Sequence, residues 1–122
     1  MERIKRVEAT VQALGLSEEA MAHLLGTARI CAVLAEDRGE NPELAYIAGL
    51  LHDVVYFLTG NHTNHARRGA AWAEKMLRNL GGFEENEIRT IHNAVYLHGD
   101  KTVVHGPFVQ LLKEADVLQK GD

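Results

Sequence analysis

The sequence is poor in the residues and patterns that mark disulfide-rich, β-sheet or membrane proteins. Its single cysteine, Cys31, excludes an intramolecular disulfide and favours a reducing compartment. It has two prolines and lacks the alternation of polar and apolar residues that predicts β-strands. The apolar run at residues 49–58 (GLLHDVVYFL) is too short to span a membrane, and we find no signal peptide. We therefore expect a soluble, cytoplasmic protein.

An excess of positive charge is absent as well. The formal net charge is −4 at pH 7 with the histidines neutral, which argues against a general nucleic-acid surface or an anionic-membrane surface. A phosphorylated ligand would need a local attraction, from a metal ion or from a few basic side chains. The length of 122 residues and the 46% hydrophobic content fit one domain, residues 1–122, with a core of its own.

Capping residues and glycines divide the chain into about six helices. Ser17 is a typical N-cap, Asn41 followed by Pro42 is another, and Gly39 is a typical helix end. The expected helices cover residues 3–14, 18–38, a segment that begins at 42 and carries His52 and Asp53, and then 65–80, 84–98 and 107–120. Because no heptad repeat persists, the pattern predicts an all-α, compact irregular bundle rather than a coiled coil.

Histidine is abundant, with seven in the chain, and polar residues interrupt three apolar helix faces. His52 and Asp53 stand side by side within the apolar run of the expected third helix. His23 lies on a largely inward face of the second helix, and Asp116 interrupts an apolar stripe of the last helix. A buried polar group without a partner costs about 1–3 kcal/mol, so each of these residues requires compensation.

Each of these residues, taken alone, is compatible with an ordinary core role. A core histidine usually donates to a backbone carbonyl, and a helical aspartate usually caps a helix or pairs with arginine. Four such residues would need four independent partners. One divalent cation bound by two imidazoles and two carboxylates would compensate all of them together, so the sequence predicts a metal site.

With these residues identified, the chain resembles the HD-domain superfamily of helical metal-dependent phosphohydrolases, in its small bacterial form. The matching segments are HLLGTARICAVLA with His23, AGLLHDVVY with His52 and Asp53, and LLKEADVL with Asp116. They occur in the family's order, in apolar contexts, over residues 20–120. The resemblance implies that these four residues bind a metal ion.

Further histidines resemble the ligands of family members with two metals. They are His65 in HARRGAAWAEKML and His92 and His98 in IRTIHNAVYLHGD. The resemblance implies that Asp53 bridges two ions and that His65, with His92 or His98, completes the second site. Residues six apart on a helix point about 120° apart, so His92 and His98 share a site only if the helix ends near residue 98.

The implied activity is hydrolysis of a nucleotide or another small phosphorylated metabolite by a metal-activated water, with Asp53 as the catalytic residue. The cofactor would be one or two divalent transition-metal ions, for which Mn, Fe, Co, Ni and Zn are equally suitable. Arg67, Arg68 and Lys101 are candidates to bind the phosphate, although each also fits a solvated surface charge.

Two other functions stay open at this stage. The chain could be a non-catalytic, regulatory HD module that binds metal or nucleotide and acts through a partner. It could also be an HD-type oxygenase with two irons, because the histidine-rich set is compatible with iron. The apolar first helix would suit a homodimer, and His105, beside Gly106 and Pro107, receives no role.

Overall fold

Seven helices and no strand make up residues 2–121, the part of the chain that the computed structural model describes. The all-α class and the compact bundle are confirmed. The helices are α1 (Glu2–Gln12), α2 (Glu18–Arg38), α3 (Pro42–Leu51), α4 (Val54–Thr59), α5 (His65–Leu80), α6 (Glu85–Leu97) and α7 (Pro107–Lys120).

The capping residues begin and end helices as predicted. The Ser17 side chain accepts a hydrogen bond from the Ala20 amide at 3.1 Å, and the Asn41 side chain accepts one from the Leu44 amide at 3.1 Å. Gly39 closes α2 in the left-handed region, with φ of 74°. Local sequence therefore determines where α2 and α3 start, as their N-caps indicate.

The expected third helix is broken, and the prediction that one helix carries both His52 and Asp53 is wrong. α3 ends at Leu51, His52 is its C-cap, and Asp53 has φ of −125° and ψ of 16°, outside helical geometry. The chain then enters the short helix α4. The Asp53 side chain makes no capping hydrogen bond to α4, so its carboxylate is available for other contacts.

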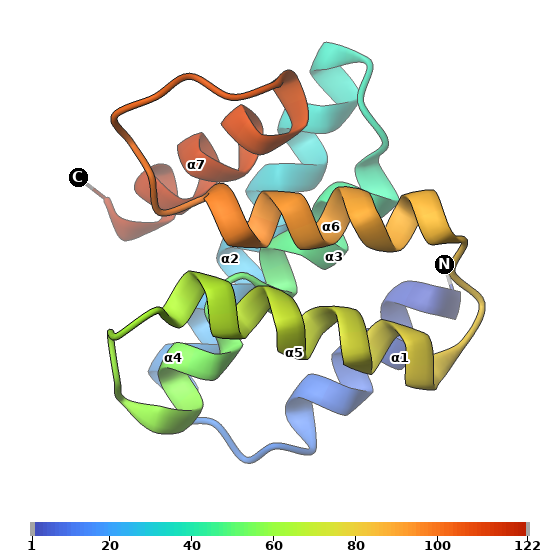
Figure 1. Ribbon diagram of the computed structural model, residues 1–122, viewed down its shortest axis with the longest axis vertical. Helices are drawn as coiled ribbons and strands as arrows, with labels where there is room; N and C mark the ends of the chain where they lie inside the picture. Colours follow the sequence, from blue (N-terminus) through green and yellow to red (C-terminus); the bar gives the residue numbers. More distant parts are fainter. Residues whose placement is uncertain (1, 122) are drawn as a thin grey trace.

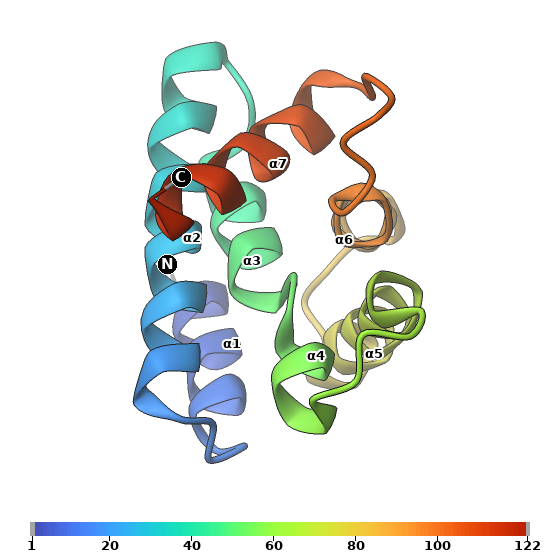
Figure 2. The same cartoon turned by 90° about the vertical axis from the view of Figure 1, so that its left-hand side faces the viewer.

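The helix α3 lies in the middle of the bundle, with seven of its ten residues buried. Figure 2 shows α1 and α2 on one side of it and α5 and α6 on the other, and in Figure 1 α5 and α6 lie in front. α2 packs on both α3 and α7. A Cβ at Gly49 would lie 2.7 Å from the Ala28 Cα, so only glycine permits this close approach of α3 to α2. The approach brings the residues of these two helices that face each other into contact range.

Two further features concern the core. Cys31 is fully buried, and burial raises the pKa of its thiol to about 12. Ile4, Val7 and Val11 of α1 are buried within the same chain. The apolar face on which we based a homodimer is therefore already covered, and the homodimer stays a prediction. No helix in residues 2–121 has the length and apolar character needed to cross a membrane.

Candidate metal centre

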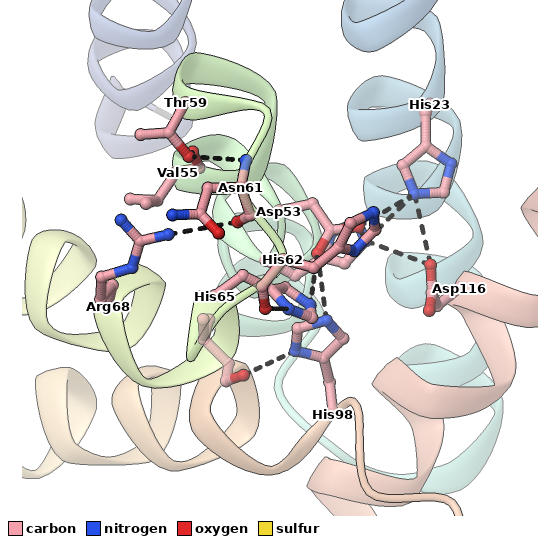
Figure 3. Close-up of polar contacts among 12 residues, drawn as sticks. His23, Asp53, Val55, Thr59, Asn61, His62, His65, Arg68, His98 and Asp116 are labelled. Carbon is pink, nitrogen blue, oxygen red and sulfur yellow. Dashed lines mark hydrogen bonds and ion pairs between the residues drawn. The ribbon is translucent and has the colours of Figure 1, made fainter.

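His23 on α2 and Asp116 on α7 come together with His52 and Asp53, which lie at the break between α3 and α4. Figure 3 shows His23, Asp53 and Asp116 of this group. One donor atom from each lies within 4.8 Å of the others. The Nε2 atoms of His23 and His52 are each 3.3 Å from Oδ1 of Asp116 and 3.2 Å from each other. These spacings leave the four donor atoms around one shared point, as a single cation would require.

A second donor group adjoins the first and shares Asp53 with it. It consists of Asp53, His65 and His98. The Nε2 atom of His98 is 3.2 Å from Oδ1 of Asp53, and that of His65 is 3.9 Å from the same oxygen. The other oxygen, Oδ2, lies 3.4 Å from His52 and 3.7 Å from His23. The Asp53 carboxylate thus directs one oxygen to each group.

The four histidines of the two groups also share one arrangement of their ring nitrogens. Each Nδ1 lies within hydrogen-bonding distance of an oxygen acceptor and donates to it. The acceptors are Gln119 Oε1 at 2.9 Å for His23, Gly49 O at 2.6 Å for His52, His62 O at 3.1 Å for His65 and Val95 O at 2.6 Å for His98. When such a ring is neutral, its proton stays on Nδ1 and its Nε2 lone pair faces the centre, which is the form that binds metal.

Charge in the first group is balanced internally in the absence of a cation. Hydrogen bonds to Asp116 and Asp53 raise the pKa of His23 to about 9. Burial alone would raise the pKa of both carboxyls, but the neighbouring histidines outweigh burial and hold both pKa values below their usual range. At neutral pH the ion-free centre therefore contains two carboxylates and a protonated His23. A cation at the same point would displace that proton.

The donor set fits a transition-metal cation. His52, His98 and Asp116 are at most 3% exposed, and buried groups of this kind require partners. Imidazole nitrogens combined with carboxylate oxygens suit Mn, Fe, Co, Ni and Zn. The assignment of these side chains as metal ligands remains a prediction. Two geometric observations support it: the donor atoms surround a shared point, and the histidine rings turn Nε2 toward it.

The sequence left His92 and His98 as alternatives, and the structure brings only His98 to the centre. α6 ends at Leu97, and His98, its C-cap, keeps helical backbone angles and faces Asp53. His92 lies elsewhere, with its Nε2 3.8 Å from Glu74 and its ring stacked on Tyr96. The inclusion of His92 is therefore corrected, because a six-residue separation on one helix turns the two side chains apart.

The predicted phosphate-binding cations have mixed surroundings. The Arg68 guanidinium donates to the carbonyls of Asn61 at 3.1 Å and Thr63 at 3.2 Å, so it braces the loop before α5. Arg67 is exposed on α5. The Lys101 ammonium donates to the His98 carbonyl at 2.7 Å and lies 3.5 Å from Asp116.

Another lysine, which sequence reasoning missed, lies at the mouth of the centre. Lys120 places its Nζ 3.5 Å from Asp116 Oδ2, and its side chain is 51% exposed. The one signal for it was its position four residues after Asp116, on the same face of the last helix.

A pocket of about 380 Å³ opens over the two donor groups. It is lined by His23, Asp53, Tyr56, Phe57, His62, His65 and Lys120. A larger hollow of about 520 Å³ lies along α1, but its lining contains no histidine and only one carboxylate, so we place the functional site at the smaller pocket. Tyr56, Phe57 and His62 carried no role in the sequence reasoning, because nothing in their spacing marks them.

Comparison with known proteins relates the chain to one family. The HD domain profile matches residues 21–121, a range that includes both donor groups. Over 82 residues the chain is 34% identical to a ribonuclease Y of Sulfurovum, covering 66% of this chain and 14% of that protein. Over 103 residues it is 32% identical to an uncharacterized protein of Clostridium beijerinckii, covering 82% of this chain and 64% of that one. The chain thus spans less than two thirds of either relative, and no solved structure matches it significantly.

Proposed function

We propose that this chain, which belongs to the HD domain family, is a metal-dependent phosphohydrolase that acts on a nucleotide or another small phosphoester. Members of this family are typically metal-dependent phosphohydrolases. The observation that carries the proposal is the position of Asp53, whose two oxygens each face a different group of histidine nitrogens. Such a carboxylate suits a centre for two cations that would share one phosphate.

The proposed ligands follow from the two groups. His23, His52, Asp116 and one oxygen of Asp53 would hold the first ion. The other oxygen of Asp53, with His65 and His98, would hold the second. A divalent cation supplies an acidified water as nucleophile and neutralises the phosphate oxygens.

The protein's own groups would hold the ligands and the substrate in place. The acceptors at Nδ1 fix the rings of the four histidines, and Asp53, as the catalytic carboxylate, couples the two groups. Lys120 lines the pocket and offers its ammonium to a phosphate. Lys101 also lies 3.5 Å from Asp116 and is a second candidate, but it does not line the pocket, and neither do Arg67 and Arg68.

The test measures metal content and hydrolysis together. Purified protein, analysed for metals and then supplied with Mn²⁺, Co²⁺ or Ni²⁺, is expected to hydrolyse members of a panel of small phosphoesters. Asp53→Asn should lower kcat/KM by more than about 100-fold, because even the partners of metal ligands contribute 10–100-fold. Asp37→Asn, an exposed aspartate on α2, is the matched control and should behave as wild type.

Other outcomes separate the alternatives. Nucleotide binding by both wild type and Asp53→Asn, without hydrolysis by either, would favour the non-catalytic module. Protein that contains iron and absorbs visible light after aerobic purification would favour the oxygenase. If the protein bound no transition metal after incubation, the proposal of a metal centre would be contradicted.

A further inference from the structure

We propose that the pocket contains an aromatic subsite, formed by Tyr56, Phe57 and His62, that binds a planar ring in the organic part of the substrate. The proposal rests on the phosphohydrolase function above, because it names the substrate class of the same site. That class is a phosphoester of a planar aromatic or heteroaromatic group, as opposed to an aliphatic or sugar phosphate.

The three rings form a continuous wall along α4 and the loop that follows it. The centroids of Tyr56 and His62 are 4.4 Å apart, and those of Tyr56 and Phe57 are 5.4 Å apart. All three residues line the pocket, with His62 exposed and the other two half-buried. A row of rings at these spacings gives an incoming planar group an aromatic surface to pack against.

The aromatic wall begins at the edge of the donor groups. The Phe57 ring is 5.9 Å from the His23 ring, in an edge-to-face arrangement. The Tyr56 ring is likewise 5.9 Å from the His65 ring. A phosphate over the donor groups would therefore bring the organic group attached to it directly against these rings.

The loop that carries His62 is braced, so the subsite exists before a ligand binds. The His62 carbonyl accepts from His65, and Arg68 donates to the Asn61 carbonyl (Figure 3). Arg68 also donates to the Thr63 carbonyl, on the other side of His62. Gly60 ends α4 in the left-handed region, with φ of 65°. A preformed surface costs a ligand less conformational entropy than a mobile loop would.

The cationic part of the pocket lies on a different helix. Lys120 on α7 touches Asp116, whereas the rings belong to α4 and its loop. The pocket is thus polarised, with an ammonium for the phosphate on one element and rings for the organic group on another. An aliphatic group would gain contact area there, but it would lack the ring–ring attraction.

The test compares two esters with chemically similar leaving groups. Benzyl phosphate and cyclohexylmethyl phosphate are both primary alkyl phosphates of similar size, and they differ in whether the ring is planar. We expect kcat/KM of the Mn²⁺-loaded protein to favour benzyl phosphate by about three- to tenfold, the range for one aromatic pair. Tyr56→Leu and His62→Leu should each move this ratio toward one. Tyr96→Leu, an exposed tyrosine on α6 outside the pocket, should leave the ratio unchanged.

A binding measurement keeps the subsite testable without turnover. Benzylphosphonate and cyclohexylmethylphosphonate are not hydrolysed, and calorimetry should show the same preference for the planar ring, again reduced by Tyr56→Leu. If no phosphoester is hydrolysed but this preference is present, the proposed function fails and the subsite stands. Equal affinity of the two phosphonates in wild type, binding of neither, or a preference that survives both leucine substitutions would overturn the subsite.

Discussion

The two donor groups that share Asp53 are built in different ways. The first takes its side chains from α2, α3 and α7, which pack tightly on one another, and its His52 is fully buried. The second depends on His65 at the start of α5, directly after an exposed loop, and the His65 side chain is 30% exposed. One half of the centre is fixed by the core of the bundle, and the other half combines the buried His98 with His65, which a short braced loop positions.

This difference indicates how tightly each ion would be held. Side chains on packed helices lose little freedom on binding, whereas a ligand beside a loop must be ordered by local hydrogen bonds. The first group also offers four donors and the second offers three. We therefore expect one tightly bound ion and one that exchanges more readily.

The largest effect should come from removing a ligand of each group in turn. His52→Ala should weaken binding of the first ion by more than about 100-fold, because it removes a proposed ligand and even the partners of metal ligands contribute 10–100-fold. His65→Ala should leave one tightly bound ion and lower the stoichiometry from two to one. Mn²⁺ titration calorimetry measures both quantities.

The control for this pair is His92→Ala, because His92 lies outside both groups. It should bind Mn²⁺ as wild type does. If His52→Ala and His65→Ala lost Mn²⁺ affinity and stoichiometry to the same extent, the proposed difference between the two groups would be contradicted. Thermal unfolding of each variant shows whether the fold has survived.

A smaller effect should follow from loosening His23 without removing it. Gln119 accepts a hydrogen bond from His23 Nδ1, and Gln119→Leu removes that acceptor at similar size. We expect an approximately tenfold loss of affinity for the first ion, at the lower end of the effect of such partners. The matched control is Gln12→Leu, at an exposed position on α1. If Gln119→Leu bound Mn²⁺ as wild type does, Gln119 would not be needed to position His23.

Gly26→Ala tests the same contact by a second route. A Cβ at Gly26 would overlap the Nε2, Cδ and Cγ atoms of Gln119, so the whole Gln119 side chain would have to move. Because a flexible side chain can move at little cost, stability should change little while metal affinity falls as in Gln119→Leu. The double variant should lose no more than either single variant, since both act on one contact.

The contrast between the two groups also explains what the sequence could predict. His23, His52 and Asp116 interrupt apolar helix faces, and such interruptions are visible as patterns. Ser17 and Asn41 act locally, so their capping roles were visible too. The break between α3 and α4 was not, because the apolar pattern continues through His52 and Asp53 and only tertiary packing determines where the helix stops.

The mouth of the centre was invisible for a related reason. Tyr56 and Lys120 belong to the pocket because the fold brings part of α4 and the end of α7 to the same cavity, which is a property of the folded chain. The choice between His92 and His98 likewise depended on which face of α6 is directed toward Asp53, which only the folded chain decides. Helix ends are the least certain part of any reading from sequence, and this site is built largely from helix ends.

The first group should also make the stability of the metal-free protein depend on pH. His23 has a pKa raised from 6.5 to about 9, so its protonated form stabilises the folded state. That stabilisation is complete below pH 6.5 and is lost as the pH rises through 9. We expect the free energy of unfolding to fall by about 1–2 kcal/mol across this window, less than the full shift implies because the ring borders the open pocket.

Chemical denaturation of metal-free protein at several pH values measures this slope, and His23→Gln should remove it. The lowered pKa values of Asp53 and Asp116 act in the acid range, where stability is lost as the pH falls, so they leave this window unaffected. Mn²⁺ binding near pH 8 should release about one proton, seen as a buffer-dependent binding enthalpy. Mn²⁺ binding without proton release would show that His23 carries no proton for the cation to displace.

The smallest effect should come from the brace of the second group. Arg68→Leu removes two hydrogen bonds to the loop before α5, and we expect about two- to fivefold weaker binding of the second ion. The first ion and KM should stay unchanged, because Arg68 orders the loop and does not line the pocket. Arg67→Leu, its exposed neighbour, is the matched control. If Arg68→Leu raised KM, and added salt raised the KM of wild type in the same way, Arg68 would instead be a phosphate-binding residue. The loop before α5 would then be held by other contacts.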